Sequence, residues 1–364
     1  HKKPSGVWIM AYTDIDKPTD YFKTKLYTGN GSGQAITGVG FQPDLIWWKC
    51  RNAAKNHGLT DSVRGNTKRI KSNSSDAEST VTDYIQSFDS NGFTVGSNGN
   101  LNSNGDTFCS WNWKAGTSFT NDASGTGIGS IDSTGSVNTD AGFSIVSYTG
   151  TGSTGTVAHG LGVAPSMLIY KNRASTDSWN VQHDGLTSYD YYVRLNSTGA
   201  QNNDIDVGPT APTSTVVTVG SHAQQNGNGN AMILYAFADK QGYSKFGSYT
   251  GNGAASDGTF SYTGFKPTFI ILKSTGVNDW RIIDNKRSLS GGSNPIDKYF
   301  YAQSSAAEGA SSTNGVPDQI DFLSNGFKIR QASAGINGSG QKYIYMAFAE
   351  NPFVTSSGVP ATAR

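Results

Sequence analysis

A pattern of three landmarks occurs three times along the sequence, and no other feature constrains the fold as strongly. Each occurrence opens with Tyr-Thr-Gly-x-Gly, at residues 27–31, 148–152 and 249–253. A Gly-x-x-Pro sequence with an apolar run follows, at 40–49, 162–171 and 264–273. An apolar stretch closes each occurrence, at 108–113, 232–237 and 344–348. Because the spacing of the first two landmarks changes by no more than one residue between successive occurrences, the sequence predicts three copies of one unit.

Within the copies, short apolar runs are bounded by Gly, Asn, Ser and Pro, and no window carries a sustained 3.6-residue apolar stripe. The first copy has candidate strands at 22–28, 34–39, 44–51, 57–63, 68–72, 84–88, 92–96 and 106–113. Strands of this length and spacing are typical of a β-sandwich. The segment 76–84 fits either a short helix or a loop turn. We therefore predict an all-β fold of three tandem β-sandwich repeats, jelly-roll or lectin-like, with pseudo-threefold internal repetition.

The landmarks also predict the division of the chain. We expect an N-terminal segment at 1–21, sandwich repeats at 22–116, 142–242 and 243–353, a Gly/Ser/Thr-rich linker at 117–141, and a C-terminal tail at 354–364. The run Leu45–Trp48 is continuously apolar, as is a strand covered on both faces. We expect this strand and its counterparts to lie under a long loop or to hold the copies together.

Composition excludes several classes of protein. The 364 residues carry a net charge of +1 with no Lys/Arg block, and no apolar run approaches the length of a membrane span. We therefore expect no nucleic-acid partner and no membrane insertion. Cys50 and Cys109 match no metal-ligand spacing, so they either pair or are buried thiols. Asp-x-Asp at 14–16 and 204–206 offers oxygen ligands for calcium, but solvated carboxylates are the commoner case. We expect no metal and no cofactor.

The ends of three corresponding strands provide the candidate site. In all three copies the strand ends in an acid, and in the first and third copies a cation follows it, as Asp61 with Arg64 and as Asp284 with Arg287. Such a pair either forms an ion pair that fixes the end of the strand to the following turn, or presents a carboxylate and a guanidinium to a sugar. Exposed aromatic side chains beside Asn and Gly are the usual saccharide platform. The tryptophans considered for that role are Trp8, Trp111, Trp113, Trp179 and Trp280. We select Trp179, Trp280, Asp61 and Arg64 as candidate glycan- or receptor-binding residues, and no catalytic residue.

Several motifs together resemble a known but uncharacterised repeat family. They are the segments 10–13, 17–22, 27–31, 40–47, 61–65 and 347–353. The family occurs in tail-fibre-like and other virion structural proteins of aquatic and marine bacteriophages, particularly those of cyanobacteria. The resemblance runs from about Met10 to Arg364, and it implies a location on the virion, the extracellular particle surface, without implying catalytic residues. It also suggests that 358–364 is a natural C-terminus. Separately, Met10 looks like a natural start, so we expect residues 1–9 to be either upstream sequence or a cloning remnant.

Three functions follow as expectations. The first is a non-enzymatic virion surface or fibre protein that binds a host receptor or surface glycan. The second is a structural capsid-decoration or tail-appendage subunit whose repeats serve assembly. The third is a secreted adhesin or polysaccharide-degrading enzyme, which would need a carboxylate pair at a defined separation. In either virion role the partners are other virion proteins, and we expect a homo-oligomer, by analogy with the trimers of phage fibres.

Overall fold

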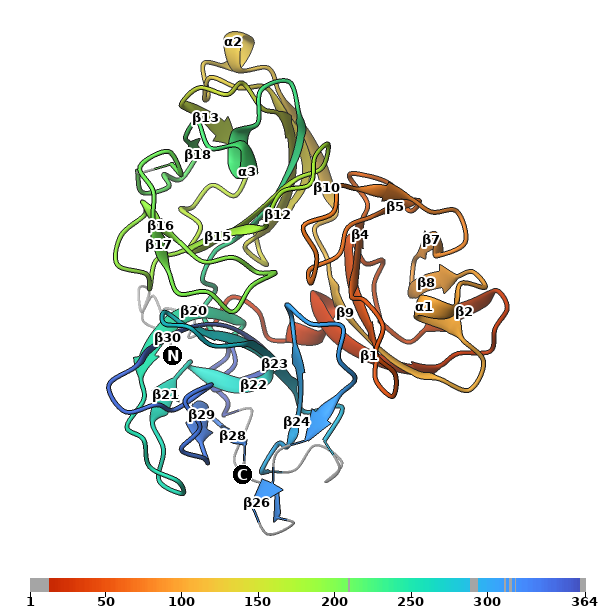
Figure 1. Cartoon of the computed structure of the whole chain (residues 1–364), viewed down its shortest axis with the longest axis vertical. Coiled ribbons are helices and arrows are strands. Elements are labelled where there is room, and N and C mark those ends of the chain that lie inside the picture. Colours follow the sequence, from red (N-terminus) through yellow and green to blue (C-terminus); the bar gives the residue numbers. More distant parts are fainter. Residues whose placement is uncertain are drawn as a thin grey trace, which may run out of the picture.

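Three lobes of antiparallel β-sheet surround a common centre (Figure 1). The computed structural model describes residues 13–208, 210–288, 294–310, 312–313, 316–317 and 319–360. We call residues 22–113 lobe 1, residues 117–237 lobe 2 and residues 244–352 lobe 3. The predicted all-β class is confirmed. Of the predicted division of the chain, the linker at 117–141 is corrected below, and the other boundaries stay predictions.

Lobe 1 has strands where turn residues interrupt runs of β-branched and aromatic residues. After the short helix η1 (Pro18–Asp20) come β1 (Phe22–Thr28), β2 (Gln34–Thr37), β3 (Leu45–Cys50), β4 (Gly58–Asp61), β5 (Lys68–Arg69), β6 (Ser79–Thr80), β7 (Ile85–Asp89), β8 (Gly92–Val95), α1 (Gly99–Asn102) and β9 (Thr107–Trp113). Every strand predicted for this copy is present, with bounds that differ by a few residues. The helical alternative for 76–84 is wrong, because this segment holds β6 and turns.

Lobe 2 begins with two strands where we predicted a linker. Its elements are β10 (Thr117–Asn121), α2 (Ala123–Thr126), β11 (Ser133–Asn138), β12 (Phe143–Thr149), β13 (Gly155–Ala158), β14 (Met167–Asn172), β15 (Asn180–His183), β16 (Tyr191–Tyr192), β17 (Asn202–Asn203), β18 (Val216–Val219), α3 (Ala223–Asn226) and β19 (Ala231–Phe237). The linker prediction for 117–141 is wrong because β12 offers this segment a sheet edge, with which β11 pairs over its whole length. Gly135 leaves room for the Phe119 ring of β10.

Lobe 3 completes the chain. Its strands are β20 (Ser244–Thr250), β21 (Phe260–Tyr262), β22 (Phe265–Ser274), β23 (Trp280–Asp284), β24 (Lys298–Tyr301), β25 (Gly309–Ala310), β26 (Ser312–Thr313), β27 (Val316–Pro317), β28 (Ile320–Leu323), β29 (Gly326–Ile329) and β30 (Lys342–Pro352). The long strand β22 pairs with both β23 and β30, and a register shift interrupts its pairing with β30 at Pro267. Proline lacks the N–H that a regular ladder requires.

The same strand order occurs in the large sheet of each lobe. The orders are β1-β9-β3-β4, β12-β19-β14-β15 and β20-β30-β22-β23, and lobe 2 adds β11 and β10 beyond β12. A smaller sheet packs on each, formed by β2-β8-β7, β13-β18 and β21-β29-β28. Each lobe therefore has two facing sheets, with one apolar core between them.

A fourth apolar core lies where the three large sheets face one another. It takes side chains from all three lobes. Near its middle, Trp113, Phe237 and Phe348 form a triangle with ring centroids 5.9–6.5 Å apart. The strands β3, β14 and β22 carry side chains into this core on one face and into their own lobe's core on the other. As expected of the continuously apolar runs, these strands hold neighbouring parts of the chain together, here the three lobes.

The Tyr-Thr-Gly landmark is explained by a buried asparagine. The side-chain oxygen of Asn102 accepts a hydrogen bond from the backbone N–H of Asn30, at 3.0 Å. Asn226 and Asn337 make the corresponding bonds to Thr151 and Asn252. The first glycine of the landmark has no space for a side chain, because a Cβ on Gly29 would lie 2.1 Å from a backbone oxygen. The landmark is therefore a structural feature, as its turn residues predicted.

The two cysteines are buried free thiols. Cys109 lies opposite Lys49 in the pairing of β3 with β9, while Cys50 lies opposite Phe108. Because successive side chains of a strand point to opposite faces, the two thiols lie on opposite sides of the sheet. Burial raises the pKa of Cys109 well above its usual value, which keeps the thiol protonated and unreactive.

Candidate functional site

Trp179 and Trp280 are buried at the junctions between lobes. The indole N–H of Trp179 in lobe 2 donates to the backbone oxygen of Lys71 in lobe 1, at 2.8 Å. The indole N–H of Trp280 in lobe 3 donates to the backbone oxygen of Arg194 in lobe 2, at 2.9 Å. Each tryptophan is at most 1% exposed. Both therefore join neighbouring lobes.

His57 makes the corresponding contact at the third junction. Its Nδ1 accepts a hydrogen bond from the indole N–H of Trp47 at 2.9 Å, so the proton is on Nε2, which donates to the backbone oxygen of Tyr301 in lobe 3. Both bonds require the neutral ring. Burial lowers the pKa of His57 well below its usual value, and the charge of Lys49 adds to the effect.

Asp61 and Arg64 form a buried ion pair that continues into lobe 2. The Nε of Arg64 lies 2.5 Å from Oδ2 of Asp61, and neither side chain is exposed. The Tyr235 hydroxyl of lobe 2 donates to the same carboxylate oxygen, at 2.7 Å. Arg64 also pairs with Glu78, which accepts two hydrogen bonds from Arg173 of lobe 2. Burial alone would raise the pKa of Glu78, but the hydrogen bonds and charges of the two arginines hold it below its usual value.

The junction between lobe 1 and lobe 3 has the same arrangement. Asp284 pairs with Arg287 at 2.6 Å, and both side chains are fully buried. The indole N–H of Trp111 in lobe 1 donates to Asp284. Arg287 also pairs with Glu308, which accepts two hydrogen bonds from Arg51 of lobe 1. At both junctions, a glutamate and an arginine from distant parts of the sequence thus extend the ion pair at the strand end into a network.

The junction between lobe 2 and lobe 3 lacks these charges. His183 takes the place of the acid, and its Nε2 lies 3.1 Å from the backbone oxygen of Tyr345. Leu186 takes the place of the arginine and is buried in the central core. The backbone contact nevertheless persists, since the Gln201 N–H donates to the Thr275 oxygen at 2.8 Å, as the Glu78 N–H does to the Arg173 oxygen at 2.9 Å. The strand end of lobe 2 therefore differs from those of lobes 1 and 3 in lacking the buried ion pair.

The structure does not support the glycan assignment of the four selected residues. Trp179, Trp280, Asp61 and Arg64 are all buried, and protein atoms already take their hydrogen bonds. The interpretation of Asp61 with Arg64 as an ion pair at a strand end is the one that the geometry fits. Trp111 and Trp113 are also buried, and Trp8 lies outside the described residues. Glu78 and Glu308 are not among the candidate residues, because they follow no motif in the sequence and only the fold brings them to the arginines.

The neutral His57 makes stability depend on pH. Because the pKa of His57 is lower in the folded chain than in the unfolded chain, its contribution is complete above about pH 6.5 and is lost as the pH falls towards the folded pKa. We expect the free energy of unfolding, measured in urea, to fall by up to about 1.4 kcal/mol per pH unit below pH 6.5 through this group.

The control is His57→Gln, which keeps a donor and an acceptor but does not titrate. This variant should show a shallower slope between pH 7 and pH 5. His159, whose pKa burial lowers to about 4, supplies a remaining slope. An equal slope in both proteins would contradict the assignment of a neutral His57.

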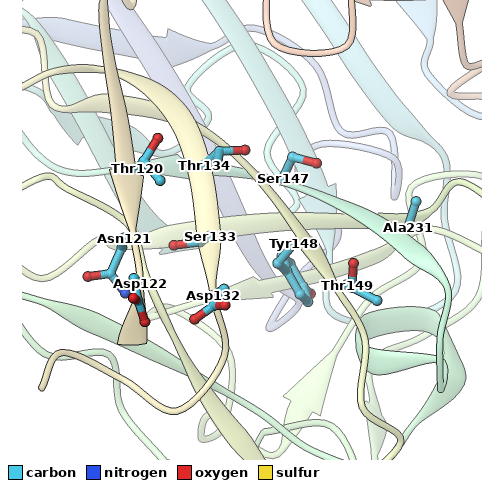
Figure 2. Close-up of a pocket in the computed structure, with 10 residues that line it drawn as sticks. All are labelled: Thr120, Asn121, Asp122, Asp132, Ser133, Thr134, Ser147, Tyr148, Thr149 and Ala231. Carbon is cyan, nitrogen blue, oxygen red and sulfur yellow. The ribbon is translucent and has the colours of Figure 1, made fainter. Parts of the chain in front are cut away.

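A hollow of about 380 Å³ lies at one end of β10, β11 and β12. Figure 2 shows the residues that line it. Its two carboxylates are already used. Asp122 accepts from the backbone N–H groups of Ser124 and Gly125, and these contacts together with the Ser124 hydroxyl lower its pKa. Asp132 accepts from the N–H of Ala123. The single aromatic side chain of the lining, Tyr148, is 4% exposed, so it gives a sugar no platform.

A larger groove, of about 640 Å³, follows β20 at the edge of lobe 3. Phe260 and Tyr262 of β21 line it and are 44% and 55% exposed. Asp184 and Gly185 of lobe 2 line it as well, so it lies at the junction without the charged network. Lys245, also in the lining, is paired with Asp239. This groove combines exposed aromatic rings, polar side chains and the edge of a sheet.

No group of three His, Cys, Asp or Glu side chains in the described part of the chain is placed to hold a metal ion. The Asp-x-Asp sequences are engaged by protein atoms, since the Asp16 carboxylate accepts from Ser356 and the Asp206 carboxylate accepts from Ser221. Among the helices that the structure describes, none is long and apolar enough to span a membrane.

A family model described as a domain of unknown function, DUF7483, matches residues 17–352. The chain belongs to this family. The DUF7483 match begins just before η1 and ends with β30, so its unit is the set of three lobes together and not one lobe. No curated protein and no solved structure matches the chain.

Proposed function

We propose that this chain is a non-enzymatic structural subunit of a virion surface, a capsid decoration or a tail appendage, whose lobes serve assembly. The observation that carries the proposal is the use of the polar residues at the strand ends. Asp61, Arg64, Trp179 and Trp280 join lobes to one another and present nothing to a ligand. Buried ion pairs and one common core connect the three lobes into a single unit, and such a unit suits a structural part of a particle.

The virion context comes from the sequence resemblance. We further propose that the lobes are three β-sandwich copies of one unit, jelly-roll or lectin-like, related by a pseudo-threefold arrangement. The equal strand order of the large sheets and the corresponding contacts at the junctions support this. The partners would be other virion proteins and further copies of the chain in a homo-oligomer.

A second candidate function is the binding of a host receptor or surface glycan by a virion fibre. Phe260 and Tyr262 favour it, because exposed rings beside Ser and Thr side chains are a saccharide platform. In this function the β20 groove would be the site, and none of the four residues selected from the sequence would contact the sugar.

A cryo-EM map of the intact particle distinguishes the two functions. For a structural subunit we expect the three-lobed density to cover a shell regularly or to stack along a tail. Density confined to the distal tip of the tail would contradict the structural role and favour receptor binding. In that case glycan-array binding should be lost in the double variant Phe260→Ser, Tyr262→Ser and kept in the unmodified chain.

A further inference from the structure

The outer edge of β20 has backbone groups available for another strand. Tyr243 and Gly251 bond towards β30, so by alternation residues 244, 246, 248 and 250 point their N–H and C=O groups to the opposite side. On that side, the backbone N–H and C=O of Ser244 both bond to the backbone of Lys240. The Phe246 N–H donates to the Asp239 carboxylate, and the Thr250 backbone oxygen accepts from the Thr259 hydroxyl. The Phe246 oxygen, both backbone groups of Ser248 and the Thr250 N–H have no bond from any described residue. Ser248 and Thr250 are exposed.

The corresponding edge in lobe 2 is occupied. β12 has the same place in its sheet as β20, and both end in Ser-Tyr-Thr, at 147–149 and 248–250. On β12 this edge carries β11, antiparallel, with Thr134 opposite Ser147 and Ser136 opposite Ile145. Just before β11, Ile131 bridges to Val157 of β13 and is buried in the core of lobe 2. β11 therefore closes the gap between the two sheets of its lobe.

In lobe 3 the same place is the groove of about 640 Å³. β20 lines one wall and β21 the other, as β12 and β13 flank β11. Gly247 adds no side chain to the bottom of the groove, where a Cβ would lie 2.6 Å from the Tyr345 hydroxyl. β1 of lobe 1 differs, since it carries Lys23 and Lys25, the residue type by which natural edge strands avoid pairing, whereas the one lysine of β20, Lys245, is paired with Asp239.

We propose that β20 accepts an extended strand from another polypeptide, antiparallel to Phe246–Thr250, in the place that β11 takes on β12. Main-chain hydrogen bonds provide the affinity of such strand addition, and alternate side chains provide the specificity. A Cβ on Gly185 would lie 3.1 Å from the Cβ of Ser248, and residues 247–250 of the lining are uncharged. The accepted strand therefore has small uncharged side chains, like Ser133–Asn138, and an apolar side chain near one end, like Ile131. This inference rests on the proposed assembly function and names the chemistry of the contact.

The probe is a synthetic peptide of residues 130–138, added to the full chain and followed by fluorescence anisotropy. In β11, the backbone N–H and C=O groups of residues 134 and 136 point towards β12, and those of residues 135 and 137 point towards β10. We expect N-methylation at 134 or 136 to weaken binding roughly tenfold or more, since a ladder hydrogen bond is lost and a methyl group intrudes. N-methylation at 137 is the matched control and should leave the affinity nearly unchanged.

The protein variant is Ser248→Pro. Its missing N–H faces the open edge, where proline is tolerated, so the variant should fold and lose peptide binding. Hydrogen exchange of the unmodified chain should show slower exchange of the Ser248 and Thr250 amides with peptide present. If the variant does not fold, the N-methylated peptides and the exchange data still decide.

Absence of saturable binding, or equal loss for methylation at 136 and 137, would overturn the inference. So would a glycan that binds here and is sensitive to Tyr262→Ser but not to Ser248→Pro. These results leave the assembly function standing, because regular particle density tests that function separately.

Discussion

Trp113→Ala is expected to lower the free energy of unfolding by about 3–5 kcal/mol, the usual cost of removing a buried large aromatic ring. Trp113 is 1% exposed and packs against Phe237 of lobe 2 and Phe348 of lobe 3, as well as Phe22 and Phe269. Because this ring touches all three lobes, its loss should weaken them together. Denaturant unfolding followed by fluorescence and by circular dichroism should show one transition, shifted as a whole.

The matched control is Phe93→Ala, which truncates a ring in the core of lobe 1 alone. If the lobes unfold as one body, it shifts the same single transition. If the lobes were independent, unfolding would show separate transitions, and each variant would move only some of them. That result would contradict the role of the central core described above.

Asp284→Leu is expected to cost about 3–5 kcal/mol, because it leaves the buried Arg287 without its closest counter-charge. It also removes the acceptor of the Trp111 indole N–H, a contact between lobes. Urea unfolding at pH 7 measures the loss. A loss below about 1 kcal/mol, the value of a surface pair, would contradict the burial of this ion pair.

The junction between lobe 2 and lobe 3 suggests the control for this variant. His183 and Leu186 stand there in the places of the acid and the arginine. The double variant Asp284→His, Arg287→Leu copies that solution and buries no unpaired charge. It should cost less than the sum of its two single variants, and the difference is the coupling free energy of the pair. Strict additivity would show that the two side chains do not interact.

The strands of the first copy could be predicted from sequence because turn residues and β-branched runs mark them locally. The failure at 117–141 has a physical cause, since Ser, Thr and Gly pair readily when a neighbouring strand such as β12 offers an edge. Trp179 was misassigned because its acceptor, the Lys71 oxygen, is in another lobe and has no local signal. The apolar run at 45–48 did predict a strand covered on both faces, because both faces of this strand pack on apolar cores.

The hairpin of β10 and β11 makes the three lobes unequal. Of the described edges that correspond to one another, β12 is closed by β11, β1 carries two lysines, and β20 has a groove beside it. A body with three equivalent open edges would have a valency of three and would cross-link its partners into a branched network. If the proposed strand addition takes place, a chain with one such edge accepts one partner segment, so we expect a stoichiometry of one segment to one chain.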